Sequence, residues 1–308
     1  MKNKYLNKLL IISGPTATGK TDLAVKLAKK YNGELVSGDS CQIYRGMDVG
    51  TGKDQPDETP IHLIDIINPD QKFSVAQFKE IGLKTIKEIQ SRGKLPILVG
   101  CSGFYIDALI NPNYDTFSVK QNKSLRFILK MFSVSTLQKI YKFLDKSGFS
   151  KLNHSDINNH YRLSRKIEIK LFQKKKPSLP KEDLLGFNIF HISLTAPLDY
   201  LYKRIDLRVN KRMEIGFLDE IKKLLKKYKW SDQGMQIAAY KCLHPYFKNS
   251  TPEILSDCLK KWSYAEHSDA RRQSCWFKSK SGALFFDITQ KNFDKQIFTL
   301  INRWYTKS

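Results

Sequence analysis

The chain has 308 residues and a mass of 35.7 kDa, enough to bury one large core or one core with a smaller lobe. Its 53 Lys and Arg outnumber 30 Asp and Glu, and the net charge of +23 favours a polyanionic partner such as nucleic acid, although a solvated basic surface would also account for it. No apolar run reaches the ~18 residues of a membrane span. The five cysteines form no CxxC pair, which argues against structural zinc. We therefore expect a cytoplasmic protein with no membrane association.

Strands and helices alternate in the first third of the chain. Four short apolar runs predict strands, at Lys8–Ser13, Glu34–Ser37, His62–Ile67 and Leu95–Gly100. One helix is expected over Asp22–Tyr31, and a second from the capping box at Ser74 to Gly93. This alternation predicts a doubly wound α/β core with a parallel sheet of the P-loop type.

The composition changes near residue 118. Between Lys120 and Lys181 there are sixteen Lys or Arg and three acidic residues, in a pattern that favours helices. A buried strand returns at Asn188–Leu194, and helical patterns then fill Pro197–Lys248 and Pro252–Phe277. We expect a catalytic core interrupted by a basic, mostly helical insertion, with the core formed by residues 1–118 and 184–308 and the insertion by residues 119–183.

A glycine-rich loop between the first strand and the first helix is the strongest functional signal. Its GxxxxGK[ST] pattern aims several backbone N–H groups into one concavity, at the positive end of a helix. Lys20 adds a full positive charge, and the Thr21 hydroxyl is placed to bind Mg²⁺ that bridges phosphate oxygens. We therefore predict a diphosphate or triphosphate site over Gly14, Pro15, Thr16, Ala17, Thr18, Gly19, Lys20 and Thr21.

The loop alone does not identify the phosphate compound. The DxxG and NKxD motifs of GTPases are absent from the expected places, and the strand Leu95–Gly100 continues into Cys101-Ser102 without the carboxylate of ATPase motors. Asp39 follows the strand beside the loop, at the sheet edge where ligands bind, and could be a general base or an Mg²⁺ ligand. For Asp65, a turn or capping role is favoured.

At this point several sequence blocks resemble the tRNA dimethylallyltransferases, also called tRNA isopentenyltransferases. The family's GPTxxGKT loop, its Asp-Ser pair and its Ile-Tyr-x-Gly-Met-Asp-x-Gly-Thr-x-Lys stretch all have counterparts before residue 54. The matching blocks follow in the same order over most of the chain, at Gly14–Thr21, Asp39–Ser40, Ile43–Lys53, His62–Phe78, Leu95–Leu109, Tyr161–Ile169, Arg204–Ile221 and Ala270–Lys278. The family's eukaryotic zinc finger has no counterpart, so we expect the bacterial type.

The resemblance implies transfer of a dimethylallyl group from dimethylallyl diphosphate to N6 of adenosine 37 of tRNA, just 3′ of the anticodon. We expect the enzyme to be a monomer. Asp39 would take the N6 proton as general base. Lys20, Thr21 with Mg²⁺, and Arg208 would stabilise the leaving diphosphate. Ser102, at a position where the family has threonine, would help orient the reacting centre.

The resemblance also implies an extensive surface for tRNA, whose target base must leave its stack. The aromatic side chains at Tyr161, Tyr240, Trp276 and Phe277 could stack on bases or pack in a core. The implied contacts are Asp39, Ser40, Cys41, Gln42, Ser102, Arg126, Tyr161, Arg162, Leu163, Ser164, Arg165, Gln236, Tyr240, Lys241, Arg271, Arg272, Gln273 and Lys278.

Three short segments depart from the family pattern. Gly100-Cys101-Ser102 replaces Gly-Gly-Thr, Ala239-Tyr240-Lys241 replaces Gly-Tyr-Arg, and Trp276-Phe277-Lys278 replaces Trp-Phe-Arg. Serine keeps the hydroxyl of threonine, whereas lysine keeps the charge of arginine but loses its bidentate phosphate contact. The departures therefore bear on tRNA affinity more than on the chemistry.

Three other functions remain open at this level. An adenylate isopentenyltransferase would prenylate a free nucleotide and needs no basic insertion. A small-molecule P-loop kinase would transfer a phosphoryl group from ATP. A nucleic-acid-binding protein with an inactive P-loop is disfavoured by the intact Lys20 and Thr21.

Overall fold

The computed structural model describes residues 7–53, 59–111, 119, 121–172, 186–280 and 282–306. It divides the chain into two compact units. The first contains residues 1–111 and 183–308, and the second contains residues 112–182. The second unit thus begins at residue 112, seven residues before the expected start at 119. It ends at residue 182, one residue before the expected end at 183.

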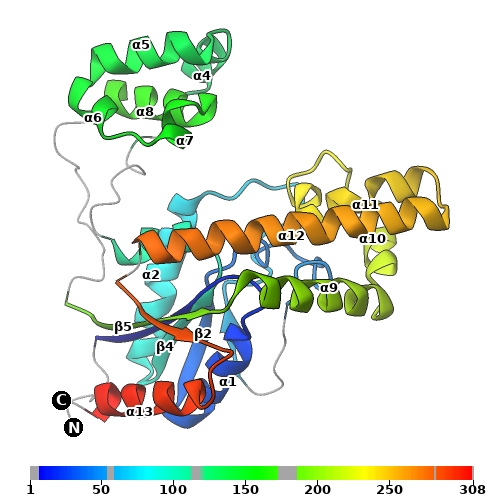
Figure 1. Ribbon diagram of the computed structural model, residues 1–308. Helices are drawn as coiled ribbons and strands as arrows, with labels where there is room; N and C mark the ends of the chain where they lie inside the picture. The colour runs from blue at the N-terminus through cyan, green and yellow to red at the C-terminus, as the bar shows by residue number, and fades with distance from the viewer. Residues whose placement is uncertain are drawn as a thin grey trace. The chain divides into compact units, whose positions relative to one another are not determined.

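The first unit is built on a six-stranded parallel sheet of order β3-β2-β4-β1-β5-β6 (Figure 1). Its strands are β1 (Lys8–Ser13), β2 (Gly33–Ser37), β3 (Ile61–His62), β4 (Leu95–Gly100), β5 (Asn188–Thr195) and β6 (Leu284–Asp287). β1 lies between β4 and β5, with Ile11 opposite Leu98 on one side and His191 on the other. The predicted α/β fold is therefore confirmed.

Helices cover both faces of this sheet (Figure 1). They are α1 (Lys20–Tyr31), α2 (Val75–Ser91), α3 (Gly103–Ile110) and α13 (Phe293–Thr306). Leu10 and Ile12 of β1 pack on the side of α1 and α13, and Leu9 and Ile11 pack on the side of α2 and α3. This alternation buries the central strand on both faces, as its continuous apolar sequence predicts. The carboxyl end of β1 is thus held rigidly where the glycine loop begins.

A layer of helices extends from the carboxyl edge of the sheet. It contains α9 (Leu198–Glu214), α10 (Phe217–Leu225), the 3₁₀ turn η2 (Gly234–Gln236), α11 (Ala238–Lys248) and α12 (Pro252–Lys280). Trp262, Tyr240 and Phe217 are fully buried in its core. The long α12 contacts both α9 and α11 (Figure 1). The helices were expected here, whereas β6 and α13 were not predicted from the sequence.

The second unit is a small helical bundle. Its described helices are α4 (Lys123–Lys130), α5 (Val134–Leu144), α6 (Lys146–Ser150), α7 (His154–Ile157) and α8 (His160–Phe172). Leu137, Leu163 and Ile167 are fully buried at its centre. The expectation of a helical insertion is confirmed for these residues. Lys174, Lys175, Lys176 and Lys181, which contribute to its expected basic character, lie outside the described residues.

The predicted strand at His62–Ile67 is wrong beyond its first residue. Leu63 and Asp65 have positive φ angles of 63° and 55°, which a strand does not allow. The turn places the Asp65 carboxylate against Lys53, whose Nζ donates to Oδ1 at 2.5 Å. Asp65 is therefore a structural turn residue, in line with the favoured interpretation. No helix within the described ranges is both long and apolar enough to cross a bilayer.

Candidate active site

The glycine loop joins β1 to α1 at the carboxyl edge of the sheet. Gly14 has φ of 137°, and a Cβ there would lie 2.3 Å from the carbonyl oxygen of Leu194 in β5. Gly19 has φ of 79° and directly precedes α1. These glycines let the backbone pass close to the sheet and turn into the helix. The loop thus presents N–H groups at the helix N-terminus, as a phosphate cradle requires.

Lys20 is held within this loop. Its Nζ donates to the carbonyl oxygen of Pro15 at 2.7 Å, and the Thr18 hydroxyl donates to the same oxygen at 2.9 Å. Burial lowers the pKa of Lys20, while the negative charge of the nearby Asp39 opposes that shift. A phosphate oxygen would offer the ammonium a charged partner in place of a neutral carbonyl. Lys20 is therefore placed to bind an anion in the loop.

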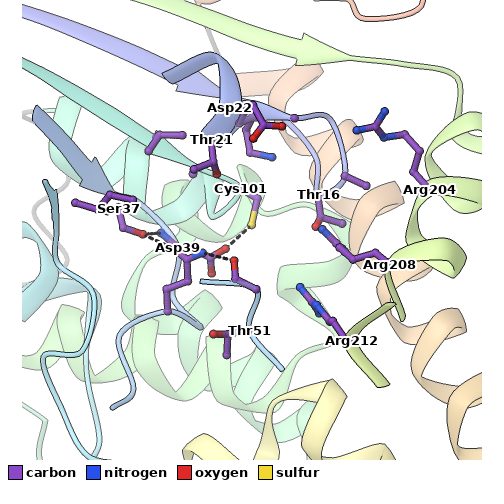
Figure 2. A pocket seen from close by; sticks show the side chains of 18 of the residues that line it. Thr16, Thr21, Asp22, Ser37, Asp39, Thr51, Cys101, Arg204, Arg208 and Arg212 are labelled. Carbon is purple, nitrogen blue, oxygen red and sulfur yellow. Dashed lines mark hydrogen bonds between the residues drawn. The ribbon is translucent and has the colours of Figure 1, made fainter. Parts of the chain in front are cut away.

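Three arginines of α9 line the other side of the loop (Figure 2). Arg204, Arg208 and Arg212 are spaced by four residues, which places them along one face of the helix. Arg208 donates from Nη2 to the Thr16 hydroxyl at 2.8 Å. Arg208 alone was predicted from the sequence, although the four-residue spacing would have indicated Arg204 and Arg212 as well.

Glu266 of α12 joins two of these arginines. Its carboxylate accepts hydrogen bonds from Arg208, from Arg212 at 3.0 Å and from the indole N–H of Trp262 at 2.8 Å. Burial alone would raise the pKa of Glu266, but the two guanidinium groups outweigh it and hold that pKa below its usual value. Glu266 is thus a buried anion that fixes two cations beside the phosphate loop. Glu266 was not predicted from the sequence, because it lies 58 residues from Arg208 and 54 residues from Arg212.

α12 also contacts the glycine loop directly. The Gln273 side-chain oxygen accepts the backbone N–H of Thr16 at 2.8 Å. The resemblance implied a tRNA contact for Gln273, and the structure places it on the phosphate loop. A bound phosphate would compete with Gln273 for this N–H group.

Asp39 lies beyond the end of β2, across the cavity from Arg208 (Figure 2). Its Oδ1 accepts the backbone N–H of Cys41 at 2.9 Å, and its Oδ2 accepts the thiol of Cys101 at 3.1 Å. Burial raises the pKa of the Cys101 thiol, and the charge of Asp39 raises it further. The thiol therefore remains protonated and acts as a donor to the carboxylate.

Ser102, the residue directly before α3, bonds Ser40, which follows Asp39 in the chain. Its hydroxyl oxygen accepts the backbone N–H of Ser40 at 3.1 Å, and the two serine hydroxyl groups are also 3.1 Å apart. Gln42 accepts a hydrogen bond from Ser37 at 2.8 Å and donates to the carbonyl of Gly52 at 3.2 Å. The structure thus brings Asp39, Ser40, Gln42 and Ser102 together, as the resemblance implied.

Residues of the glycine loop, α1, α9 and the segments after β2 and β4 line one cavity of about 480 Å³ (Figure 2). Lys20, the arginines of α9 and the loop form its cationic side, and Asp39 with Cys101 faces them. Thr21, Asp22 and Asp39 bring hydroxyl and carboxylate oxygens to the same space. Oxygen ligands of this kind, completed by phosphate oxygens, fit Mg²⁺. The cavity can therefore hold an anionic group beside a candidate base.

Glu220 of α10 binds the backbone directly before Thr51 and Gly52, two residues that line this cavity. Its carboxylate accepts the backbone N–H groups of Asp48 and Val49 at 2.7 Å each and that of Gly50 at 3.0 Å. The hydroxyl of Tyr240 donates to the same carboxylate at 2.7 Å. Glu220 lies within a block that matches the family, but the resemblance implied no role for it. Its partners are backbone N–H groups about 170 residues away in the sequence, which no local motif indicates.

Some of the implied tRNA contacts are wrong as side-chain contacts. Tyr240 and Leu163 are completely buried, and Ser164 is nearly so. Phe277, considered as a stacking residue, is also buried and belongs to the sheet core. Each of these side chains fills the interior of its own unit and is not available to a base.

Other implied contacts lie at the surface or serve neighbouring residues. In the first unit, Arg271, Arg272 and the half-buried Trp276 border a shallow hollow on α12. In the second, Tyr161 is exposed and Arg162 is half exposed, whereas Arg126 and Arg165 bind the buried Glu168. The remaining exposed positions are Gln236, Lys241 and Lys278. A tRNA contact at these positions stays a prediction.

Comparison with known proteins now identifies the family. A family model described as IPP transferase matches residues 42–280, and one described as isopentenyl transferase matches residues 7–66. The chain belongs to the IPP transferase family. A tRNA dimethylallyltransferase of Halalkalibacterium halodurans is 39% identical, over 96% of each chain. One of Bacillus cytotoxicus is 36% identical, over 98% of this chain and 96% of the relative.

Solved structures agree with membership of the IPP transferase family. The full-length tRNA isopentenylpyrophosphate transferase of Bacillus halodurans superposes with a TM-score of 0.71 and 33% identity, covering 97% of each chain. A eukaryotic dimethylallyltransferase described as acting on tRNA has a TM-score of 0.78 at 24% identity, covering 96% of this chain and 78% of that one. The eukaryotic likeness supports the fold.

Proposed function

We propose that this protein is a tRNA dimethylallyltransferase, which transfers a dimethylallyl group from dimethylallyl diphosphate to N6 of adenosine 37 of tRNA. One observation carries the proposal: a carboxylate, Asp39, lies in the same cavity as an intact phosphate loop and a guanidinium group, Arg208. A general base and an anion-binding loop that line the same cavity suit a nucleophilic displacement in which diphosphate is the leaving group. The proposal includes a monomeric enzyme acting in the cytoplasm.

The cationic side of the cavity would hold the diphosphate. Backbone N–H groups of the loop, the Lys20 ammonium and the Arg208 guanidinium would bind its oxygens. Negative charge grows on these oxygens as the bond between carbon and the bridging oxygen breaks. Groups that are already held in position stabilise this charge without reorganisation. Glu266 holds Arg208 in position through their hydrogen bond.

Asp39 would act on the opposite side of the same carbon. The exocyclic nitrogen of adenine attacks the allylic carbon, the carbon–oxygen bond breaks, and diphosphate leaves. The nitrogen then carries an extra proton, which passes to the Asp39 carboxylate. Ser102 would help to orient the reacting centre through its bond to the Ser40 backbone.

Mg²⁺ is the cofactor that we propose for this site. When bound, it would neutralise part of the charge on the diphosphate. The Thr21 hydroxyl, at the first turn of α1, would hold it together with phosphate oxygens, and Asp22 or Asp39 could supply a carboxylate.

The charge of the chain supports a nucleic-acid acceptor. The +23 net charge and the exposed Tyr161 and half-exposed Arg162 of the second unit suit a large polyanion with accessible bases. A free nucleotide offers far fewer phosphates and would not require this surface. An adenylate isopentenyltransferase or a small-molecule kinase is therefore the weaker reading of the same cavity.

Replacement of Asp39 tests the proposed chemistry. With labelled dimethylallyl diphosphate, Mg²⁺ and unmodified tRNA, Asp39→Asn should slow transfer by about 10²- to 10⁴-fold, because the amide cannot accept the proton. The dissociation constant for tRNA should change less than about threefold, since one neutralised carboxylate removes no phosphate contact. Asp294→Asn, at an exposed position of α13, is the matched control.

Two outcomes would contradict this assignment. Near-normal transfer by Asp39→Asn would show that Asp39 is not the base. An equal loss of transfer and of tRNA binding would show that Asp39 positions the RNA instead.

A further inference from the structure

Glu220 of α10 uses its whole carboxylate to hold a short backbone segment beside the cavity. Oε2 accepts the backbone N–H groups of Asp48 and Val49, and Oε1 accepts the N–H of Gly50 and the hydroxyl of Tyr240. These four donors match the four lone-pair positions of a carboxylate. Any effect of Glu220 on a ligand must therefore pass through the backbone that it binds.

The same segment is packed so closely that its two glycines leave no room for a side chain. A Cβ on Gly50 would lie 2.4 Å from the ring of Phe217 and 2.5 Å from that of Tyr240. Gly52 has φ of 62°, and a Cβ there would lie 2.2 Å from Nη2 of Arg212. Nη1 of Arg212 donates to the carbonyl of Gly50 at 3.1 Å. Contacts from α9, α10 and α11 thus fix the path of this segment.

The carbonyl of Gly52 in turn orients the side chain of Gln42. This carbonyl can only accept, so the nitrogen of the Gln42 amide is the atom that faces it, at 3.2 Å. The amide oxygen accepts the Ser37 hydroxyl at 2.8 Å. A primary amide has two N–H groups and two lone pairs, so Gln42 keeps one of each after these two bonds.

A paired donor and acceptor suit an adenine base. Gln42 lines the same cavity as Asp39, the proposed general base. Adenine offers an amino N–H next to a ring nitrogen that accepts, and a glutamine amide can bind both at once. The amide does so only if its plane is held in the right direction, which is what the bond to Gly52 provides.

We propose that Glu220 is a positioning residue for the acceptor base, which acts through Gly52 on the amide of Gln42. This inference rests on the proposed function, in which an adenine enters the cavity beside Asp39. Loss of the carboxylate would leave three consecutive backbone N–H groups without their partner. The segment would then shift, and Gln42 would lose the bond that directs its amide toward the base.

A double-mutant cycle on kcat/KM for unmodified tRNA tests the proposal. Gln42→Ala removes the paired contact and should lower kcat/KM by about 10- to 100-fold. Glu220→Gln replaces one accepting oxygen by a donor, and should lower it by about 3- to 10-fold. The variant with both changes should stay within about twofold of Gln42→Ala, because the two residues act on one contact.

Two controls separate this role from a general loss of structure. Glu214→Gln, at an exposed position near the end of α9, should stay within about twofold of the native kcat/KM. The dissociation constant for inorganic diphosphate should stay within about threefold of native in Glu220→Gln, because the phosphate loop does not depend on Gln42. If Glu220→Gln folds poorly, Tyr240→Phe removes one donor to Glu220 and keeps the buried ring. It should lower kcat/KM by about 2- to 5-fold alone and have no effect beside Gln42→Ala.

Losses that multiply in the double variant would overturn the inference, because they would show that Glu220 does not act through Gln42. A native kcat/KM in either single variant would also overturn it, and so would an equal loss of diphosphate binding in Glu220→Gln. Absence of transfer to tRNA by the native protein would instead refute the proposed function. The two failures are therefore distinguishable.

Discussion

At the scale of single residues, the site depends on charges that are fixed before any ligand binds. Arg208 bonds both the Thr16 hydroxyl of the phosphate loop and the buried Glu266. Arg212 bonds the same glutamate and the carbonyl of Gly50. Because Glu266 fixes both guanidinium groups, little reorganisation is needed when charge develops on a leaving group.

Replacing Arg208 should therefore affect the chemical step strongly. We expect Arg208→Ala to reduce transfer by about 10²- to 10³-fold, as expected for the loss of one donor to a developing charge. Single-turnover transfer with saturating tRNA measures this effect. Lys203→Ala, an exposed cation of the same helix outside the cavity, is the control and should stay within about twofold of the native rate. Equal losses in the two variants would contradict a specific role for Arg208.

Residues whose role is set by a local motif could be predicted, and residues whose role depends on distant partners could not. Gly14, Gly19 and Lys20 belong to one short loop whose geometry follows from its own sequence. Glu220 and Glu266 act on backbone and side chains more than fifty residues away, which no local pattern shows. The resemblance implied a tRNA contact for Tyr240. Its side chain is buried instead, and its hydroxyl donates to Glu220.

At the scale of the element, the residues of α8 that the resemblance implied as tRNA contacts lie partly on a buried face and partly at the surface. Leu163, Ile167 and Glu168 point into the bundle, and Arg162 is half exposed and pairs with Asp156. Arg165 and Arg126 bind the buried Glu168. A segment treated as one contact surface from sequence therefore separates into a surface residue and a structural ion cluster.

This division predicts different effects for two neighbouring arginines. Arg162→Ala should weaken tRNA binding and lower the slope of log K against log salt by about 1, with unchanged thermal stability. Arg165→Ala should destabilise the helical unit by about 1–3 kcal/mol, because it removes a charged partner from a buried carboxylate. Salt-dependent tRNA binding and hydrogen exchange of α8 in the full chain measure the two effects.

Lys295→Ala, at an exposed position of α13, is the control for general charge loss. A loss of affinity in Arg162→Ala no larger than in this control would contradict the tRNA role of α8. Native stability of Arg165→Ala would contradict the structural role of the ion cluster.

The same scale explains which elements the sequence could predict. β1 and β4 are uninterrupted apolar runs buried on both faces, and their bounds agree with the expected ones. The segment after Ile61 is also rich in apolar residues, yet Leu63 and Asp65 adopt positive φ angles, and Lys53 binds the Asp65 carboxylate in this turn. β6 is a four-residue edge strand whose half-exposed residues carry no clear alternation.

At the scale of the whole molecule, the chain combines a P-loop core with a separate helical unit and a net charge of +23. The cavity of the core suits the diphosphate and the general base that we propose for it. Neither needs so much positive charge. A polyanionic acceptor accounts for the excess, and its affinity should fall steeply as salt rises.

Choice of acceptor is the most direct test of the central claim that this P-loop holds the leaving group of a prenyl transfer to RNA. The protein is given labelled dimethylallyl diphosphate and Mg²⁺ with unmodified tRNA and AMP together, and a parallel reaction contains labelled ATP. We expect label from the prenyl donor in tRNA alone, with none in AMP and no phosphoryl transfer from ATP. Label in AMP, phosphoryl transfer from ATP, or no label in either acceptor would contradict it.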